Sequence, residues 1–233
     1  MGMQDITFHE AEIQKTSDGS STLVHMVLGE LYHSRHGAWT ESQHIYILHG
    51  LHCLLETELP SILVFEMGFG SGLNAALTRE EADRHQIPVH YTSLELYPLD
   101  ASVVDKMEMP RQTPDARKRW LDLHRSTWGE ATQISPYFTL HKLQAAFPNI
   151  PQETYAKWHL VYYDAFAPAA QPELWNAEAM RACYEILVPG GMWLSYCGKG
   201  QVRRILRDAG FEVEALPGPP GKREITRAIK PSF

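Results

Sequence analysis

A glycine-rich loop followed by an acidic residue is the first feature of this sequence that suggests chemistry. The loop FEMGFGSGLN, residues 65–74, stands between a short apolar run and a helix-like pattern. Gly68, Gly70 and Gly72 let the backbone turn sharply and let a ligand lie against main-chain amides at a helix N-terminus. Glu95 ends the next apolar run, where a carboxylate can accept hydrogen bonds from two ribose hydroxyls. The pattern predicts a nucleotide-containing cofactor; a tight connection beside a surface acid is the alternative.

The spacing within the loop limits which cofactor is expected. Its glycines follow GxGxG, because Leu73 stands where the dinucleotide fingerprint GxGxxG needs glycine. No lysine follows the loop, so the phosphate-binding pattern GxxxxGK[ST] is absent too. Glu66 adds negative charge where a pyrophosphate would sit. It favours a cationic ligand group instead, such as an amino-acid ammonium or a sulfonium.

A second acidic residue ends another apolar run. In VYYDAFAPAAQPELW, residues 161–175, Asp164 is placed to project from a strand end into the same crevice as the glycine loop. Phe166 and Pro168 follow in a stiff apolar segment that suits a flat base or the exclusion of water. The carboxylate can orient an amine and accept its proton, which suits group transfer from a cationic donor. The alternative is that Asp164 caps the next helix.

The segment YHSRHGAWTES, residues 32–42, is polar and aromatic and precedes the core pattern. It is therefore a candidate lid or substrate loop, with Tyr32, Ser34, Arg35 and His36 as its chemistry-bearing residues. A zinc site would need further ligands at suitable spacing, and Cys53 is the one thiol near this histidine-rich region. We expect no metal, and expect His49, His52 and Cys53 to pack on one face of a helix.

Composition places the chain among soluble globular proteins. It has 44% hydrophobic and 21% charged residues, which excludes collagenous, coiled-coil and disordered classes. We expect a cytoplasmic protein with reduced cysteines, no signal peptide and no membrane span. The net charge is −7, but residues 198–230 hold eight basic and four acidic residues. This +4 segment fits a polyanionic partner, and a solvated helix face would give the same count.

Strand-like and helix-like segments alternate through most of the chain. We expect one α/β domain over residues 59–233, with a doubly wound, mostly parallel sheet and an antiparallel last strand. Residues 1–58 are expected to form a small extension of a hairpin, a substrate loop and a helix over 43–59 with Ile45, Leu48, His52 and Leu55 on one face. Further helices are expected over 73–86, 98–126 (broken at Pro110 and Pro114), 171–188 (ended by PGG) and 202–210. The expected core strands cover 61–68, 89–98, 137–143, 158–166, 192–198, 211–216 and 225–230.

Taken together, these motifs resemble a known family. YHSRHGAWTES, FEMGFGSGLNAALT, YYDAFAPAAQPELW, SYCGKGQVRRILRDAGF and LPGPPGKRE are similar to the tRNA (5-methylaminomethyl-2-thiouridine) methyltransferases. These are class I enzymes that use S-adenosylmethionine, and they include the N-terminal methyltransferase domain of bifunctional MnmC as well as stand-alone versions. The resemblance implies methylation of the 5-aminomethyl group of a wobble uridine in tRNA, giving 5-methylaminomethyl(-2-thio)uridine. No FAD-dependent oxidoreductase domain is expected here, so a separate oxidoreductase would act upstream.

The resemblance also implies roles for particular residues. The residues that it implies for the cofactor loop and the ribose site are Glu66, Gly68, Phe69, Gly70, Gly72, Asn74 and Glu95. Asp164 matches the aspartate beside the methyl acceptor, and Lys222 and Arg223 match an element near tRNA phosphates, to which we add Lys199 and Arg203. Class I methyltransferases often place an acid after the third strand to bind adenine, but residues 131–152 contain none. Gln144 is the expected substitute.

Three other functions remain open from the sequence. An aminopropyltransferase of the polyamine synthase type shares the glycine loop and both acids, but usually carries an acid where this chain has Phe69 and Ser71. A small-molecule amine methyltransferase would not need the basic segment 198–230. A non-catalytic tRNA-binding module would have no reason to keep Glu66, Glu95 and Asp164 together.

Overall fold

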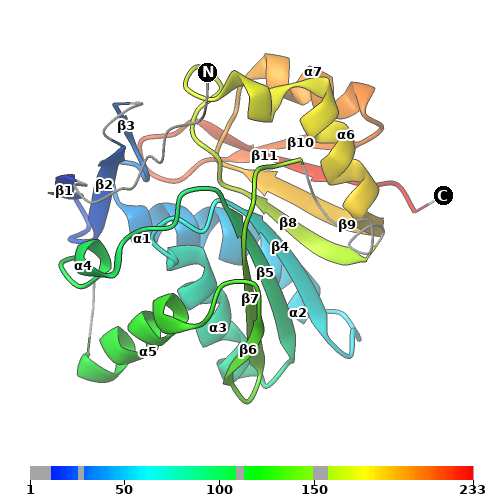
Figure 1. Ribbon diagram of the computed structural model, residues 1–233. Coiled ribbons are helices and arrows are strands. Elements are labelled where there is room, and N and C mark those ends of the chain that lie inside the picture. Colours follow the sequence, from blue (N-terminus) through cyan, green and yellow to red (C-terminus); the bar gives the residue numbers. More distant parts are fainter. Residues whose placement is uncertain (1–11, 26–28, 109–112, 149–156, 233) are drawn as a thin grey trace.

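The computed structural model describes residues 12–25, 29–108, 113–148 and 157–232. Figure 1 shows a twisted central sheet between two layers of helices, as the alternating pattern predicts. The sheet has the order β10-β11-β9-β8-β4-β5-β7-β6. Five neighbouring strands run parallel: β9 (Leu187–Ser195), β8 (Trp158–Tyr163), β4 (Ile62–Met67), β5 (Val89–Glu95) and β7 (Phe138–Gln144). The last two strands, β10 (Glu212–Pro217) and β11 (Glu224–Ile229), add the antiparallel edge that the sequence predicts.

The two central strands read as almost continuous apolar runs because helices cover both of their faces. In β4 every side chain except that of Leu63 is buried, and β8 follows the same pattern. On one face lie the helix formed by α1 (Ala38–Ser42), η1 (Gln43–Leu51) and α2 (His52–Leu55), together with α3 (Leu73–His85) and α5 (Pro114–Arg125). On the other face lie α6 (Ala177–Ile186) and α7 (Gly200–Asp208). This arrangement leaves the carboxyl ends of the parallel strands open for a ligand.

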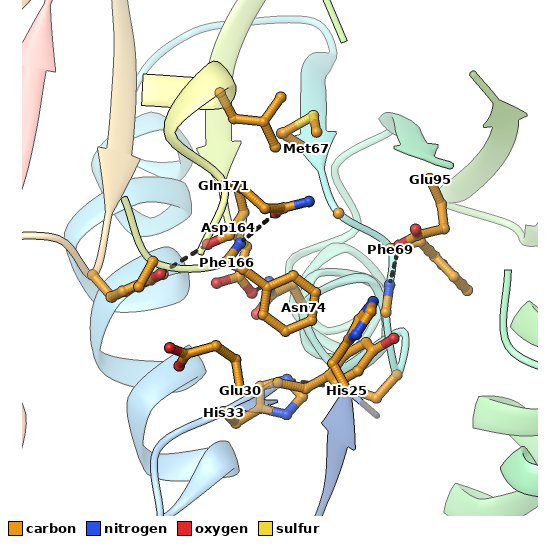
Figure 2. Close-up of a pocket in the computed structure, with 18 of the residues that line it drawn as sticks. His25, Glu30, His33, Met67, Phe69, Asn74, Glu95, Asp164, Phe166 and Gln171 are labelled. Carbon is orange, nitrogen blue, oxygen red and sulfur yellow. Dashed lines mark hydrogen bonds between the residues drawn. The ribbon is translucent and has the colours of Figure 1, made fainter. Parts of the chain in front are cut away.

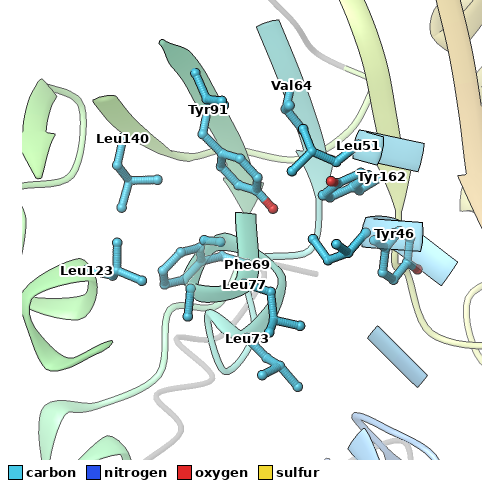
Figure 3. Close-up of a cluster of buried hydrophobic side chains, with 14 of the residues drawn as sticks. Tyr46, Leu51, Val64, Phe69, Leu73, Leu77, Tyr91, Leu123, Leu140 and Tyr162 are labelled. Atoms are coloured by element: carbon cyan, nitrogen blue, oxygen red, sulfur yellow. The ribbon is translucent and has the colours of Figure 1, made fainter. Parts of the chain in front are cut away.

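Figure 3 shows how the first face is packed. Val64, Tyr91 and Leu140 project from three neighbouring strands toward Leu77 of α3 and Leu123 of α5. The helix at residues 38–55 belongs to the same cluster. The predicted boundary between extension and core, at residues 58 and 59, therefore separates segments that bury their side chains together.

The predicted apolar face of the helix over residues 43–59 is wrong at Leu48, although Ile45 is buried as expected. Leu48 is 48% exposed, whereas Tyr46, Ile47 and Leu51 are buried with Ile45. Its central part, η1, is π-helical, with backbone bonds from residue i to i+5 and a wider turn than the α-helix. A spacing of 3.6 residues per turn thus selects the wrong side chains.

Several other boundaries differ from the prediction. Strand β6 (Ala131–Ser135), antiparallel to β7, has no expected counterpart, because an exposed edge strand needs little apolar patterning. Pro114 does not break a helix but begins α5, where Thr113 Oγ1 accepts a hydrogen bond from Ala116 N at 3.1 Å. The short α4 (Ala101–Val104) precedes it, and Pro110 lies outside the described residues.

The PGG sequence lies inside a strand rather than ending a helix. Helix α6 begins after Asn176, following a 3₁₀ turn at Pro172–Trp175, and ends at Ile186. Strand β9 then includes Gly190 and Gly191, and its register against β8 shifts between Trp158 and Leu160. Glycine accommodates such a bulge, which explains why the same residues suggest a turn in the sequence.

The predicted N-terminal hairpin is confirmed. Strands β1 (Glu12–Lys15) and β2 (Ser21–His25) pair in antiparallel fashion around the Asp-Gly turn, and β3 (Glu30–Leu31) completes a small separate sheet. Within the described ranges, no helix combines the length and the apolar character required to cross a bilayer. The three cysteines are free thiols.

Candidate active site

A cavity of about 390 Å³ opens at the carboxyl ends of β4, β5 and β8. Its walls come from the glycine loop, from the segments that follow β5, β7 and β8, and from residues 30–35. Figure 2 shows Glu95 at one end of this cavity and Asp164 near the other, with Phe166 between them. The sequence places both acids at strand ends, and the fold brings them to the same cavity.

At two positions of the loop, a neighbouring segment comes so close that only glycine fits. Gly68 has φ +93°, and a Cβ atom there would lie 2.9 Å from the carbonyl oxygen of Asp164. Gly70 has φ +48°, and its Cβ would lie 3.2 Å from the ring of Tyr32. Side chains at these positions would be strained and would push the loop away from both neighbours. The glycines therefore keep the loop against the Asp164 segment and the substrate loop.

Backbone amides hold Glu95 at the edge of the cavity. Its Oε2 accepts a hydrogen bond from Gly70 N at 3.1 Å, and its Oε1 accepts one from Tyr97 N at 2.9 Å. Burial raises the pKa of this carboxyl, and the hydrogen bonds from the backbone oppose that effect. The carboxylate is thus fixed in one orientation at the end of β5.

Asp164 is held by two side chains. Tyr46 Oη donates to Oδ1 and Asn74 Nδ2 donates to Oδ2, each at 2.9 Å. Burial raises the pKa of Asp164, while these two donors and the charge of Lys222 act in the opposite direction. The helix-cap alternative is wrong, because the cap of α6 is Asn176.

The structure corrects the expected contact between Glu66 and a cationic ligand. Glu66 is fully buried below the loop and is absent from the cavity lining. It accepts hydrogen bonds from Asn74 Nδ2 at 3.1 Å and from Ser93 Oγ at 2.6 Å. Burial raises its pKa to about 8, so a neutral carboxyl is favoured at pH 7. Glu95 and Asp164 are the acids that this part of the cavity presents.

The other predicted cofactor residues divide between the cavity and its surroundings. Phe69 and Asn74 line the cavity, whereas Gly72 supports the loop as the residue before α3. Gln144 is exposed and lies outside the lining, and its Nε2 donates to Leu96 O at 3.5 Å. The wall at this end is formed instead by residues 145–147, which follow it.

Of the predicted substrate loop, Tyr32, Ser34 and Arg35 line the cavity. The ring of Phe166 lies 4.9 Å from that of Tyr32 and 5.1 Å from that of His25, in edge-to-face contacts. These three aromatic side chains come from β2, from the segment after β3 and from the segment after β8. They form one wall suited to a planar group.

His36 and Pro168 are outside the lining. A Cβ at Gly221 would clash with the His36 ring, which shows that this ring packs on the segment before β11. Pro168 lies two residues beyond Phe166 and is half-buried.

The basic segment 198–230 is only partly available to a partner. Arg203 Nη1 lies 2.8 Å from Glu224 and its Nε donates to Thr226 Oγ1, so it joins α7 to β11. Arg227 similarly pairs with Glu214 at 2.7 Å. Four exposed cations remain: Lys199, Arg204, Arg207 and Arg223. Arg203 is therefore placed as a structural residue rather than as the predicted substrate contact.

Lys222 lies inside the cavity rather than on the surface. Its Nζ is 3.0 Å from Glu41 Oε2 and 4.1 Å from the centre of the Tyr196 ring. Glu41, Tyr196 and Tyr46 are parts of this site that sequence reasoning missed. The local sequence carries no signal for them, because each reaches the site through tertiary packing.

No group of three or more His, Cys, Asp or Glu side chains is arranged to hold a metal ion in the described part of the chain. His49 and Cys53 are half-buried along the helix at residues 38–55. His52 Nε2 instead contacts Glu81 Oε2 at 2.9 Å.

Comparison with known proteins agrees with this geometry. A family described as S-adenosyl-L-methionine-dependent methyltransferase matches residues 118–231. The chain is 26% identical over 242 residues to the tRNA 5-methylaminomethyl-2-thiouridine biosynthesis bifunctional protein MnmC of Pseudoalteromonas atlantica, covering 96% of this chain and 34% of that protein. The MnmC protein of Aromatoleum aromaticum is also 26% identical, over 93% of this chain and 35% of its own length. The chain thus spans about a third of the length of these curated relatives.

A solved structure shares nearly the whole fold. MNMC2 from Aquifex aeolicus superposes with a TM-score of 0.79 at 27% identity, over 95% of this chain and 72% of that chain. These comparisons support an S-adenosyl-L-methionine-dependent methyltransferase. Spermidine synthase from Thermotoga maritima has a TM-score of 0.52 at 12% identity, over 95% of this chain and 72% of that chain, which shows a shared fold alone.

The cavity of this methyltransferase fits its cofactor. Gly68 and Gly70 keep one wall free of side chains, and Glu95 presents a fixed carboxylate that can accept from ribose hydroxyls. The rest of the lining carries more acidic than basic side chains. The acidic ones are Glu30, Glu41, Asp164 and Glu173, and the basic ones are Arg35 and Lys222. Such a lining suits a donor and an acceptor that both carry positive charge.

Replacing Glu66 with glutamine is expected to change how stability varies with pH. The pKa of Glu66 is about 8 in the folded state against an ordinary value of 4.5, so the folded state binds more protons between these pH values. The contribution of Glu66 to stability is therefore full below pH 4.5 and is lost as the pH rises to 8. Because glutamine is neutral and similar in shape, Glu66→Gln should gain stability relative to the wild type between pH 5 and pH 8. Urea unfolding at both pH values measures this, and a constant difference would contradict it.

Proposed function

We propose that this methyltransferase transfers a methyl group to the primary amine of a 5-aminomethyl group on a wobble uridine of tRNA. The observation that carries the proposal is the position of Asp164, whose carboxylate faces the same cavity as Glu95 and the glycine loop. When bound, S-adenosyl-L-methionine supplies a methyl group activated by the sulfonium charge. The protein itself holds an aliphatic ammonium near this methyl group and accepts one proton from it.

The carboxylate of Asp164 suits this task. An alkylammonium is attracted to an acid-rich cavity, and it must lose a proton before its nitrogen lone pair can attack carbon. Both carboxylate oxygens already accept one protein donor each, so the group cannot rotate freely. The aromatic wall of His25, Tyr32 and Phe166 offers a surface on which a uracil ring can pack.

Two findings support tRNA as the carrier of the amine. The curated relatives named above are described as proteins of tRNA 5-methylaminomethyl-2-thiouridine biosynthesis. In addition, Lys199 and Arg223 are exposed close to cavity residues, since Lys199 lies three positions after Tyr196 and Arg223 follows Lys222. Cations at this place can contact the phosphates on either side of a base inserted into the cavity.

A labelling experiment tests the proposal. The protein is incubated with methyl-labelled S-adenosylmethionine and bulk tRNA from cells that lack the methyl modification, and the tRNA is then digested to nucleosides. Label in 5-methylaminomethyluridine or its 2-thio form is the expected result. Absence of label, with cofactor binding confirmed by calorimetry, would overturn the proposal. Putrescine and other small amines, tested in parallel with methyl-labelled and aminopropyl donors, would then identify the alternative reaction.

Binding of tRNA is expected to weaken with salt in proportion to the exposed cations that it contacts. Each lost phosphate contact lowers the slope of log K against log salt concentration by about 0.7 to 0.9. The double variant Lys199→Ala, Arg223→Ala should therefore reduce the slope by about one to two. The matched control is Lys118→Ala, Arg119→Ala, which removes two exposed cations from α5 on the opposite face of the sheet. Equal slopes for both double variants would remove Lys199 and Arg223 from the interface.

A further inference from the structure

A chain of hydrogen bonds holds the Asp164 carboxylate from both sides. On one side Tyr46 Oη donates to Oδ1 at 2.9 Å, from the π-helical segment η1. On the other, Asn74 Nδ2 donates to Oδ2 at 2.9 Å from the first turn of α3, and the same nitrogen donates to Glu66 Oε1 at 3.1 Å. Ser93 Oγ on β5 completes the chain by donating to Glu66 Oε2 at 2.6 Å. Two side chains thus contact the Asp164 carboxylate directly, and Glu66 of β4 and Ser93 of β5 are linked to it through Asn74.

Both direct donors to Asp164 are shielded from water. Tyr46 is 1% exposed and Asn74 is 3% exposed. If the carboxylate turned away, Tyr46 Oη would keep only the longer contact with Tyr163 O at 3.5 Å, and Asn74 Nδ2 would keep only Glu66 Oε1. Loss of a buried hydrogen bond is costly, which favours the observed orientation of the carboxylate. The ring of Tyr46 is also fixed, because it packs against the ring of Tyr162 on β8 with centroids 4.9 Å apart. The hydroxyl therefore has little freedom to follow a moving carboxylate.

We propose that Tyr46 and Asn74 are positioning residues, which fix the rotation of the Asp164 carboxylate so that its remaining lone pairs face the substrate amine. A carboxylate has about four lone-pair sites, and the two protein donors occupy one on each oxygen. One site on each oxygen stays available for an ammonium hydrogen. The inference rests on the proposed role of Asp164 as proton acceptor.

Glu66 has a different role from Asp164 in this chain of hydrogen bonds. It is fully buried, whereas Asp164 faces the cavity, and the two acids share the Asn74 amide as donor. Since burial raises the pKa of Glu66 to about 8, the neutral form anchors Asn74 without adding a second negative charge beside Asp164 at pH 7.

Other charged and titratable groups interact electrostatically with Asp164. They are Lys222 in the segment before β11, Tyr196 after β9, Tyr91 of β5 and Glu66 of β4, and Glu41 of α1 interacts with Tyr46 and Tyr196. All of them remain in place when only the hydroxyl that donates to Oδ1 is removed. A change in the pH profile on removal of that hydroxyl therefore reports its own bond to Asp164.

The variant Tyr46→Phe in the full chain tests the inference. The expected result is a kcat lower by about 10- to 100-fold, with KM for S-adenosylmethionine and for tRNA within about twofold of the wild type. The acidic limb of the profile of kcat against pH should also move to higher pH. The reason is that the lost bond favours the charged form of Asp164, so its loss raises the pKa of that carboxyl. Asn74→Ala should move the limb in the same direction and tests the other oxygen.

Tyr162→Phe is the matched control. It removes a buried hydroxyl from the neighbouring ring, where the hydroxyl lies 3.4 Å from Thr78 Oγ1 and makes no bond to Asp164. We expect its kcat and its pH profile to match the wild type. An unshifted acidic limb in Tyr46→Phe, or the same loss of kcat in Tyr162→Phe, would overturn the inference. An active Asp164→Asn variant would instead overturn the proposed role of Asp164 itself.

Discussion

Replacing Asp164 with asparagine is expected to lower kcat for methyl transfer by about 10²- to 10⁴-fold, the usual contribution of a positioned proton acceptor. The amide has nearly the shape of the carboxylate, and its one oxygen leaves Tyr46 a hydrogen-bond acceptor while its NH₂ group faces Asn74 Nδ2. Because Asn74 Nδ2 can still donate to Glu66 Oε1, the loop after β8 should keep its conformation. An amide does not accept the proton that the substrate ammonium must lose. The loss should therefore appear in kcat, measured under saturating cofactor and tRNA.

The affinity for S-adenosylmethionine separates this role from a structural one. Calorimetry should give a dissociation constant for Asp164→Asn close to that of the wild type, because the ribose is expected at Glu95, at the other end of the cavity. A second measurement is the rate at raised pH, where more of the amine is neutral in solution. The variant should recover part of its activity there. Parallel losses of cofactor affinity and turnover would show that Asp164 supports the fold of the cavity instead.

The succession of core strands along the chain and the position of both cavity acids could be predicted because they depend on local patterns. A parallel strand covered on both faces reads as an apolar run, and a residue directly after such a run lies at the carboxyl edge. Glu95 and Asp164 both satisfy this rule. The glycine loop could be recognised from the spacing of its glycines. The structure gives the reason for that spacing, because a Cβ at Gly68 or Gly70 would lie too close to a neighbouring segment.

The direction of a side chain at a strand end was harder to predict. Glu66 and Asp164 each stand near the end of a central strand, yet one is fully buried and the other faces the cavity. Side chains alternate between the two faces of a strand, so a shift of one residue in where the strand ends reverses the assignment. Gln144 is similar: the residues just after it line the cavity while its own side chain is exposed.

Contacts between distant segments carried no local signal. Tyr46 sits in a π-helical turn, which sequence periodicity of 3.6 residues does not reveal, and it reaches Asp164 118 residues later. Lys222 belongs to a basic segment, but its pairing with Glu41 turns it into the cavity. Charge counting therefore overestimated the cationic surface, since it treats a paired and an exposed cation alike.

Replacing Glu95 with glutamine is expected to weaken the binding of S-adenosylmethionine by about 10- to 100-fold, the loss typical of hydrogen bonds to a charged group. Both oxygens of Glu95 accept from backbone N–H groups, those of Gly70 and Tyr97. Glutamine has one oxygen, so its NH₂ group must face one of these donors. The change therefore removes an acceptor for the ribose and also disturbs the glycine loop through Gly70.

Turnover at saturating cofactor should fall much less than affinity, because Glu95 lies at the opposite end of the cavity from Asp164. Calorimetry with S-adenosylmethionine gives the affinity, and kcat with tRNA gives the turnover. Glu173→Gln is the matched control: Glu173 lines the same cavity and is exposed, so the same loss of charge should leave the affinity within about twofold of the wild type. Equal losses in both variants would mean that the general negative potential of the cavity binds the cofactor. A loss confined to Glu95→Gln would mean that two directed hydrogen bonds to the ribose do so.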